Sequence, residues 1–220
     1  MIERIFGLLL KEYGKQGWWP IVNPKTLLSE YRGDSPRNED ERFEIAVGAI
    51  LTQNTSWKNV ERALAGLKRA SMLSKGKIKD MPTSDLAKII TSAGYYNQKA
   101  KKLKAFVGFR GELTRDNLLD IWGIGPETAD SILLYAYAKP LFVVDAYTKR
   151  IFSRLGLAEE GVSYDSLQNL FHSSLDMDQK LFKEYHALIV EHAKRHCRTK
   201  PVCEGCPVNN QCRSFKKQKP

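Results

Sequence analysis

Apolar residues recur at helical spacing along most of the chain. In residues 2–13 the isoleucine, leucine and phenylalanine positions lie three or four residues apart, as on one face of an amphipathic helix. The same spacing predicts further helices at 38–65, 60–70, 84–91, 146–155, 164–174 and 179–196, with a polar interruption at 52–57. No β-hairpin signal and no long alternating run is present in the sequence. The pattern therefore predicts an all-α fold.

A glycine turn interrupts the helical pattern of residues 119–156. The turn reads Gly-Ile-Gly-Pro at residues 123–126, and a second helical run begins at Glu127. Glycines allow positive φ and bring backbone N–H groups close to a phosphate, while the start of the next helix adds its positive end. A turn between two packed helices has a similar composition. The motif is therefore compatible with a phosphate contact and with a plain αα-hairpin.

A single carboxylate, Asp145, follows a short apolar run at residues 142–144. Its position directly before the predicted helix 146–155 suits a helix N-cap, which accepts a hydrogen bond from a backbone N–H of the first turn. The same side chain is a candidate for chemistry, because it is an isolated acid in an apolar setting. The two roles are compatible.

The charge of the chain favours a nucleic acid as its partner. The formal net charge is +10 and the sequence pI is about 9.4, and a basic surface gains from releasing the counterions condensed on a polyanion. No stretch approaches the roughly 20 apolar residues that span a bilayer. We therefore expect a soluble intracellular protein with no membrane contact.

All four cysteines fall within residues 197–212. A disulfide framework usually has its cysteines distributed along the chain, so this grouping favours a metal ion or a metal cluster. The spacing is C-x5-C-x2-C-x5-C, through Cys197, Cys203, Cys206 and Cys212. Zinc modules more often use two close C-x-x-C pairs, and only one is present here.

Three polar or aromatic stretches allow two interpretations each. Trp18-Trp19-Pro20 is either a loop that caps a lobe or part of a ligand pocket. The polar residues 52–57 suit either a helix junction or a loop that enters a base stack. The lysine-rich residues 95–104 form either a solvated face or a surface that contacts phosphates.

These motifs together resemble the helix-hairpin-helix DNA glycosylases of the endonuclease III type. The family carries the glycine hairpin and then an aspartate in a V-D-x-x-x-x-R context, which here is residues 144–150. It also has counterparts of Gln53 and of the Gly94–Ala100 block, and the four-cysteine segment looks like its C-terminal [4Fe-4S] loop. The resemblance covers nearly the whole chain.

The resemblance implies a role for each matching residue. Asp145 would be catalytic, Gln53 would fill the gap left by a flipped nucleotide, and the four cysteines would hold the cluster. The residues implied in contact with damaged double-stranded DNA are Gln53, Asn54, Lys99, Gly123, Ile124, Gly125 and Thr128. A monomer in the cytoplasm of a prokaryotic type of cell, associated with the nucleoid, is the expected setting.

One residue departs from the strand-cleaving members of the family. They carry a lysine at the position of Glu127, and its amine attacks the sugar as a Schiff-base nucleophile. A carboxylate cannot form an imine. The resemblance therefore implies a monofunctional glycosylase without lyase activity.

Several details resemble the 3-methyladenine glycosylase branch more than the pyrimidine-repair branch. In that branch an aromatic at the position of Phe43, with the tryptophans opposite, forms the base pocket, which here implies Trp18, Trp19, Pro20 and Phe43. Electron-rich rings suit a positively charged alkylated purine through stacking and cation–π attraction. The four-cysteine loop is a departure from this branch.

The sequence thus predicts two helical lobes, with a helical barrel at residues 32–133 that ends in the hairpin. Residues 1–31 and 134–220 would form the second lobe, and DNA would lie across a cleft with the flipped base near Asp145. Within enzymes, the competing functions are a bifunctional endonuclease III acting on oxidised pyrimidines and a mismatch glycosylase. An adenine-mismatch enzyme fits less well, because Gly48 occupies the position of its catalytic glutamate. A non-catalytic helix-hairpin-helix DNA-binding protein is the competitor of another class.

Overall fold

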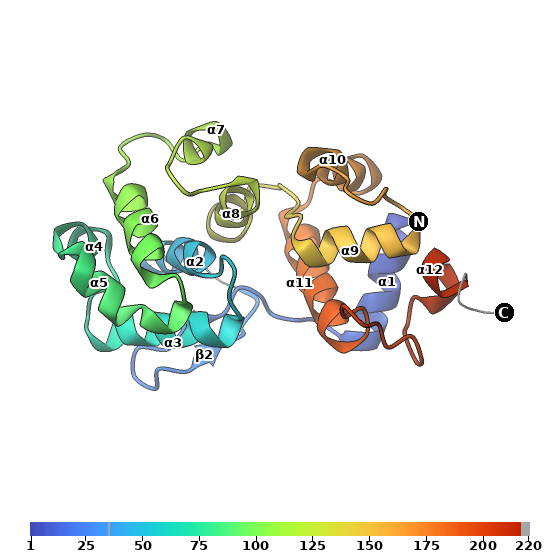
Figure 1. Ribbon diagram of the computed structural model, residues 1–220, viewed down its shortest axis with the longest axis horizontal. Helices are drawn as coiled ribbons and strands as arrows, with labels where there is room; N and C mark the ends of the chain where they lie inside the picture. Colours follow the sequence, from blue (N-terminus) through green and yellow to red (C-terminus); the bar gives the residue numbers. More distant parts are fainter. Residues whose placement is uncertain (35, 217–220) are drawn as a thin grey trace. The chain divides into compact units, whose positions relative to one another are not determined.

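The computed structural model describes residues 1–34 and 36–216, and its regular structure is mostly helical (Figure 1). The elements in chain order are α1 (Ile2–Tyr13), β1 (Ile21–Val22), β2 (Ser29–Glu30), α2 (Glu39–Leu51), α3 (Trp57–Arg69), α4 (Lys75–Asp80), α5 (Thr83–Ile89), η1 (Thr91–Ala93), α6 (Tyr96–Gly108), α7 (Arg115–Leu119), α8 (Pro126–Ser131), η2 (Ile132–Ala136), α9 (Ala146–Leu155), α10 (Tyr164–Ser174), α11 (Gln179–Arg195), η3 (Asn209–Gln211) and α12 (Arg213–Lys216). The all-α prediction is confirmed, and α1, α9 and α10 have the predicted bounds.

The chain forms two compact units. The central unit is Trp19–Lys139, and the split unit combines Met1–Trp18 with Pro140–Pro220. The sequence placed the boundaries at 31/32 and 133/134, whereas this division puts residues 19–31 and 134–139 in the central unit. The physical reason is that Val22 donates its backbone N–H to Glu44 of α2 at 2.7 Å, which joins this segment to the central unit.

A two-residue antiparallel ladder joins β1 and β2, with Ile21 opposite Glu30 and Val22 opposite Ser29. The sequence analysis found no hairpin signal, and that expectation is wrong at this point. Strands of two residues are too short to show the alternation from which strands are recognised. The ladder is held from outside, because Lys68 of α3 donates to the carbonyl of Val22 and pairs with Glu44 at 2.5 Å.

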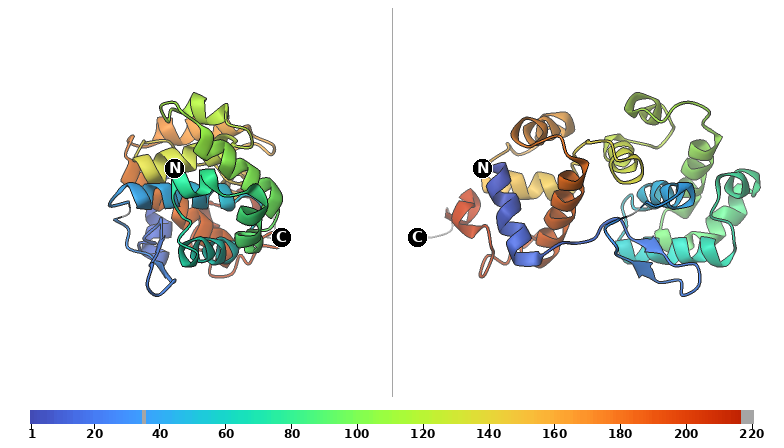
Figure 2. Two further views of the ribbon diagram at one scale, coloured as in Figure 1. Left: turned by 90° about the vertical axis from the view of Figure 1, so that its left-hand side faces the viewer. Right: turned by 180° about the vertical axis from the view of Figure 1, so that it is seen from behind.

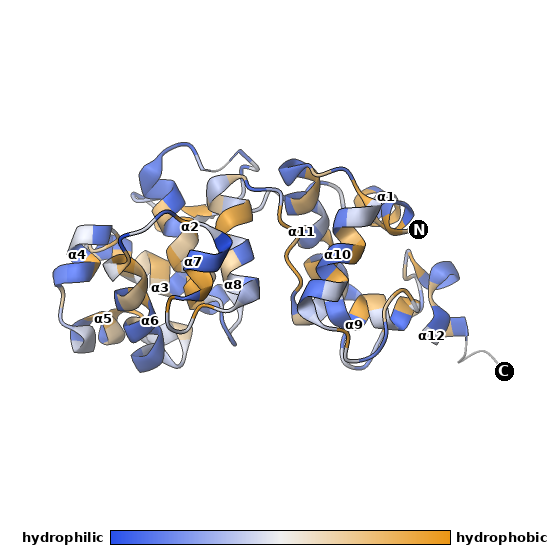
Figure 3. Ribbon diagram, turned by 90° about the horizontal axis from the view of Figure 1, so that it is seen from above, coloured by the Kyte–Doolittle hydropathy of each residue, from blue (hydrophilic) through white to orange (hydrophobic). Residues whose placement is uncertain are grey.

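The central unit is built around α2, whose last eight residues are all buried. Asn38 caps α2 by accepting from the N–H of Glu41 at 2.9 Å. Figure 3 shows apolar residues along α2, whereas α7 carries mainly hydrophilic residues. The hydrophobic effect of burying this helix is the main force that holds the unit together.

The core of the split unit is aromatic. Phe142 stacks on Phe171 with ring centroids 3.6 Å apart, and Phe152 and Phe182 complete the cluster around Tyr185. The Tyr185 hydroxyl donates to the carbonyl of Ile2 at 2.8 Å, which ties α1 to α11. The two helices lie side by side in Figures 1 and 2. The beginning and the end of the sequence therefore share one core.

No helix in residues 1–34 and 36–216 has the length and apolar character that a membrane crossing needs.

Candidate functional site

Asp145 is the N-cap of α9, as the sequence predicted. Its Oδ1 accepts from the backbone N–H and from the hydroxyl of Thr148, each at 2.7 Å. Gly156 ends the same helix in the left-handed conformation at φ 80°. Both ends of α9 are thus fixed by local hydrogen bonding, and Asp145 is held at one of them.

The second carboxylate oxygen of Asp145 faces His186 of α11. The distance from Oδ2 to His186 Nε2 is 3.6 Å, and each side chain is 14% exposed. Burial by itself raises the pKa of the Asp145 carboxyl, but His186 and the two Thr148 bonds outweigh it, so the pKa lies below its ordinary value. Asp145 is therefore a largely buried carboxylate that stays ionised.

His186 was not predicted from the sequence as a site residue. It lies beside the buried Tyr185 in an amphipathic helix, and no local spacing connects it with Asp145, 41 positions earlier. Only the packing of α9 against α11 brings the two side chains together.

The glycine turn connects α7 to α8 as a helical hairpin. Gly123 has φ 83°, and the N–H of Ile124 donates to Ile121 at 3.0 Å, so Ile124 is buried under the turn. Gly125 is the N-cap of α8 and has no side chain to accept from the first N–H groups of the helix. Arg115 and the buried Asp130 form an ion pair at 2.8 Å between the two helices. The hairpin is rigid and presents backbone N–H groups at the start of α8.

Gln53 is connected directly to the hairpin. Its Nε2 donates to the Gly123 carbonyl at 3.1 Å and to the Thr128 hydroxyl at 3.0 Å, and Lys102 of α6 donates to its Oε1. Asn54, the next residue, is exposed in the left-handed conformation at φ 52°. The structure thus joins three of the predicted DNA-contacting residues in one network, with Lys102 as a member that the sequence analysis did not name.

Lys99 does not lie on a surface, which corrects its assignment to DNA contact. Its side chain is 2% exposed, and its Nζ donates to the carbonyls of Leu51 and Ala93 at 2.8 and 2.7 Å. The position on α6 decides this, because Lys99 shares the buried face with Ala100 and Leu103. The Lys99 ammonium group therefore holds the backbone just before the loop that carries Gln53, through the carbonyl of Leu51.

The four residues predicted for a base pocket do not share one set of neighbours in the structure. Trp19 is buried in the central unit and makes edge-on contacts with Trp57 and Tyr135, with ring centroids 5.1 Å apart in both cases. Phe43 stacks instead on Phe106 of α6, with centroids 6.5 Å apart. Pro20 is buried beside Trp19, and Trp18 belongs to the split unit.

Gly48 of α2 lies directly beneath the Trp19 ring. A Cβ added at Gly48 would meet the indole at 3.2 Å. Trp19 therefore fills the space in which a larger side chain at position 48 would stand, which agrees with the sequence argument against an adenine-mismatch enzyme.

Glu127 is exposed in the first turn of α8. A carboxylate suits this position electrostatically, because the N-terminus of a helix carries a partial positive charge. It offers no amine.

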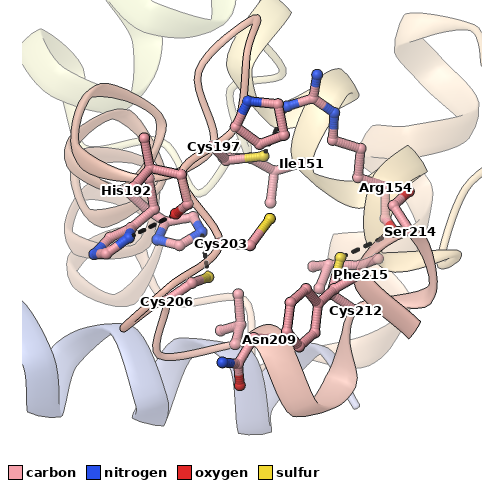
Figure 4. Close-up of a pocket in the computed structure, with 15 residues that line it drawn as sticks. Ile151, Arg154, His192, Cys197, Cys203, Cys206, Asn209, Cys212, Ser214 and Phe215 are labelled. Carbon is pink, nitrogen blue, oxygen red and sulfur yellow. Dashed lines mark hydrogen bonds between the residues drawn. The ribbon is translucent and has the colours of Figure 1, made fainter. Parts of the chain in front are cut away.

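The four cysteines line one cavity of about 200 Å³ in the split unit (Figure 4). They come from the loop after α11, while Ile151, Arg154 and Leu155 of α9 line the same cavity. Within the described residues, no three His, Cys, Asp or Glu side chains converge closely enough to hold a single metal ion. The thiols surround a space instead of meeting at one point.

Hydrogen-bond donors approach the cysteine sulfurs from two helices. Arg154 Nη1 lies 3.4 Å from Cys197 Sγ, and His192 Nε2 lies 3.8 Å from Cys206 Sγ. The Tyr13 hydroxyl contacts the other ring nitrogen of His192 at 2.8 Å. Donors of this kind stabilise the negative charge of thiolate ligands. Four thiols around one cavity, with polar groups beside two of them, are a set of residues that could hold a metal cluster.

Comparison with protein families gives one match that covers more than half of the chain. Residues 47–176 match the model of the HhH-GPD superfamily of base excision DNA repair proteins. A protein of Methanocaldococcus jannaschii, provisionally named a DNA repair glycosylase, is 45% identical over 97% of this chain and 96% of its own length.

Two solved structures resemble the chain over most of its length. A 3-methyladenine DNA glycosylase of H. pylori, bound to 1,N6-ethenoadenine, has a TM-score of 0.68 and 32% identity over 88% of this chain and 97% of that one. An endonuclease III in a non-covalent DNA complex has a TM-score of 0.79 over 99% of this chain and 96% of that one. At 20% identity, the second likeness establishes the fold alone.

Proposed function

The chain belongs to the HhH-GPD superfamily of base excision DNA repair proteins, and we propose that it is a monofunctional DNA glycosylase that removes alkylated purines such as 3-methyladenine. The observation that carries the proposal is the largely buried carboxylate of Asp145, held by Thr148 at the start of α9.

Asp145 supplies the negative charge that the reaction needs. When the bond between the base and C1′ of the sugar breaks, its electron pair leaves with the base and the sugar becomes oxocarbenium-like. A fixed carboxylate stabilises this cation and orients the water that attacks it. The water oxygen then bonds to C1′ and its proton is lost to the carboxylate or the solvent, which leaves an abasic site in an intact strand.

Glu127 is the reason to propose hydrolysis alone. A lyase of this family needs an amine that forms an imine with C1′, and residue 127 supplies a carboxylate in the first turn of α8. Water therefore remains the nucleophile.

The preference for alkylated purines rests on the aromatic residues and on one relative. The sequence assigns Trp18, Trp19, Pro20 and Phe43 to contact with the flipped base. Trp18 and Phe43 are partly exposed, whereas Trp19 and Pro20 are buried and would support the contact from the core. A purine alkylated at N3 or N7 carries positive charge, so it is attracted to electron-rich rings and is already a good leaving group. The similarity to the 3-methyladenine glycosylase of H. pylori, at 32% identity, supports this assignment.

DNA would be bound through the hairpin and the Gln53 loop. The N–H groups at the start of α8 suit a backbone phosphate, which fixes register without reading sequence. Gln53 and Asn54 lie beside this turn and are proposed to occupy the gap left by the flipped nucleotide. Thr128 and Gly123 contribute by accepting hydrogen bonds from Gln53. All of these residues belong to one chain, so we propose that the protein acts as a monomer.

We further propose that Cys197, Cys203, Cys206 and Cys212 hold a [4Fe-4S] cluster. When bound, the cluster cross-links the loop after α11 through four thiolate–iron bonds. The role assigned to it is structural: it closes a loop whose backbone is also held by Arg150 and Arg154, which donate to the carbonyls of Cys197 and Arg198 at 2.9 and 2.6 Å.

An endonuclease III-like enzyme that excises oxidised pyrimidines is the second candidate. Its support is the sequence similarity to an endonuclease III of Sulfolobus acidocaldarius, 26% identical over 88% of this chain and 90% of its own length. It predicts release of a pyrimidine lesion, where the first candidate predicts release of a methylated purine.

A panel of duplexes that each carry one lesion tests the proposal. The expected result is free 3-methyladenine or 7-methylguanine, with no strand cut before alkali treatment. Release of oxidised pyrimidines alone would favour the second candidate, and binding without release from any duplex would mean that the chain is a DNA-binding module.

A further inference from the structure

His186 contacts the Asp145 carboxylate from outside α9. It reaches Oδ2 from α11, at 3.6 Å from its Nε2. The Nε2 atom is shielded from solvent, and the ring belongs to the face of α11 that packs on α9. No motif of the sequence and no family assignment given above includes this residue.

The two oxygens of Asp145 have separate surroundings. Oδ1 accepts two hydrogen bonds from Thr148, which is the bonding of a helix cap. His186 contacts Oδ2 from a different helix, so the carboxylate is held from two elements and not by the helix cap alone.

We propose that His186 is a positioning residue of the glycosylase, which holds Oδ2 of Asp145 in the orientation that serves the reacting sugar. Its Nε2 lies at ion-pair distance from Oδ2 on the side of α11, and in this proposal an N–H at Nε2 fixes the carboxylate during the reaction. The inference rests on the proposed function, since it assigns Asp145 to the chemical step.

Preorganisation is the physical reason for such a contact. A carboxylate that must stabilise a short-lived cation is most effective when it does not have to reorient as the charge develops. A side chain that merely fills space beside Asp145 would contribute packing but would not need a donor at Nε2. The donor is therefore the property to test.

Three substitutions separate the donor from the packing. His186→Leu keeps much of the volume and removes the donor. His186→Gln retains an amide N–H near the position of Nε2, and His186→Asn has a donor that is too short to reach Oδ2. We expect single-turnover base release to slow by about 10- to 100-fold in His186→Leu and His186→Asn, with the Kd for a lesion duplex changed by less than about twofold. His186→Gln is expected to recover most of the rate.

The matched control is His172→Gln in the same unit. His172 bonds the N–H of Phe142 at 2.9 Å and stacks near Phe182, so it is a structural histidine. Its variant is expected to excise at the wild-type rate. Equal slowing in His172→Gln and His186→Leu would show general loosening of the unit and would overturn the proposal.

The remaining outcomes are also decisive. If His186→Leu does not fold, the comparison of His186→Gln with His186→Asn decides: equal rates in these two variants overturn the proposal. A wild-type rate in His186→Leu overturns it while the proposed function stands. A wild-type protein that releases no base from any duplex overturns the proposed function and this inference together.

Discussion

Asp145 caps α9, and we propose that the same side chain also acts in the chemical step. As a cap it stabilises α9, and as a carboxylate shielded from water it would provide charge where a sugar cation forms. The sequence predicted the cap and made the residue a candidate for chemistry, because it stands alone at the junction of an apolar run and a helix. Its partner His186 was not predictable, since a contact between helices leaves no trace in local spacing.

Asp145→Asn is expected to abolish base excision while DNA binding changes by less than about twofold. The amide keeps the size of the side chain and one acceptor for the Thr148 bonds, but it has no negative charge to stabilise the cation. Single-turnover release from a 3-methyladenine duplex measures the effect. Asp176→Asn, an exposed acid of the same unit, is the control, and an unimpaired Asp145→Asn enzyme would remove Asp145 from the mechanism.

Lys99→Met is expected to lower the free energy of unfolding by about 2–4 kcal/mol, because two buried carbonyls lose their donor. Urea unfolding measures this change. Lys101→Met, an exposed neighbour on α6, is the control with little expected effect. An equal effect of the two substitutions would contradict the buried role of Lys99.

The difference in unfolding free energy between the wild-type protein and Lys99→Met is expected to depend on pH. Burial, with a smaller effect of the Lys102 charge, lowers the pKa of Lys99 to about 8, whereas an unfolded chain has a value near about 10.4. Between these values the unfolded chain binds the proton more tightly, so wild-type stability relative to Lys99→Met rises as the pH rises from about 8 to about 10. A difference that falls over this range would contradict the assignment.

The hairpin and the Gln53 loop act as one element. Their sequences lie 70 positions apart, and the bond from Gln53 to Gly123 joins them. The sequence predicted each part from its residue types, but not the bond between them. It also placed Lys99 on the DNA surface, because a run of lysines does not reveal which of its members faces the core.

Gly123→Ala is expected to weaken binding to DNA with and without a lesion by a similar factor, of about tenfold. Gly123 has φ 83°, and a Cβ there would stand 2.6 Å from the side chain of Lys102, which also holds Gln53. Fluorescence anisotropy with a lesion duplex and an undamaged duplex measures both affinities. Gly76→Ala, where a Cβ meets nothing within 4 Å, is the control. Unchanged affinity in Gly123→Ala would remove the turn from the DNA interface.

The two units differ in how far the sequence predicts them. The helices of the split unit were found at their exact bounds for α1, α9 and α10, since each has a clear cap or a regular apolar face. The unit boundaries were displaced, because the segment from Trp19 to Glu30 is held by buried charges of α2 and α3 that no local pattern encodes.

The cysteine loop predicts a property of the purified protein. We expect about four iron atoms per chain and a broad absorbance near 400 nm from thiolate-to-iron charge transfer. Elemental analysis and the visible spectrum measure these. Cys203→Ser is expected to lower both the iron content and the melting temperature, and a colourless protein that contains zinc would overturn the cluster assignment.

The products formed from a duplex with one 3-methyladenine test the central claim most directly. The account predicts free 3-methyladenine by mass spectrometry, an uncut strand with an abasic site, and no covalent protein–DNA adduct after borohydride reduction. Glu127 offers no amine for an adduct, and Asp145→Asn should give no free base. A nicked strand or an efficiently trapped adduct in the wild-type reaction would contradict the account, because an amine would then be the nucleophile.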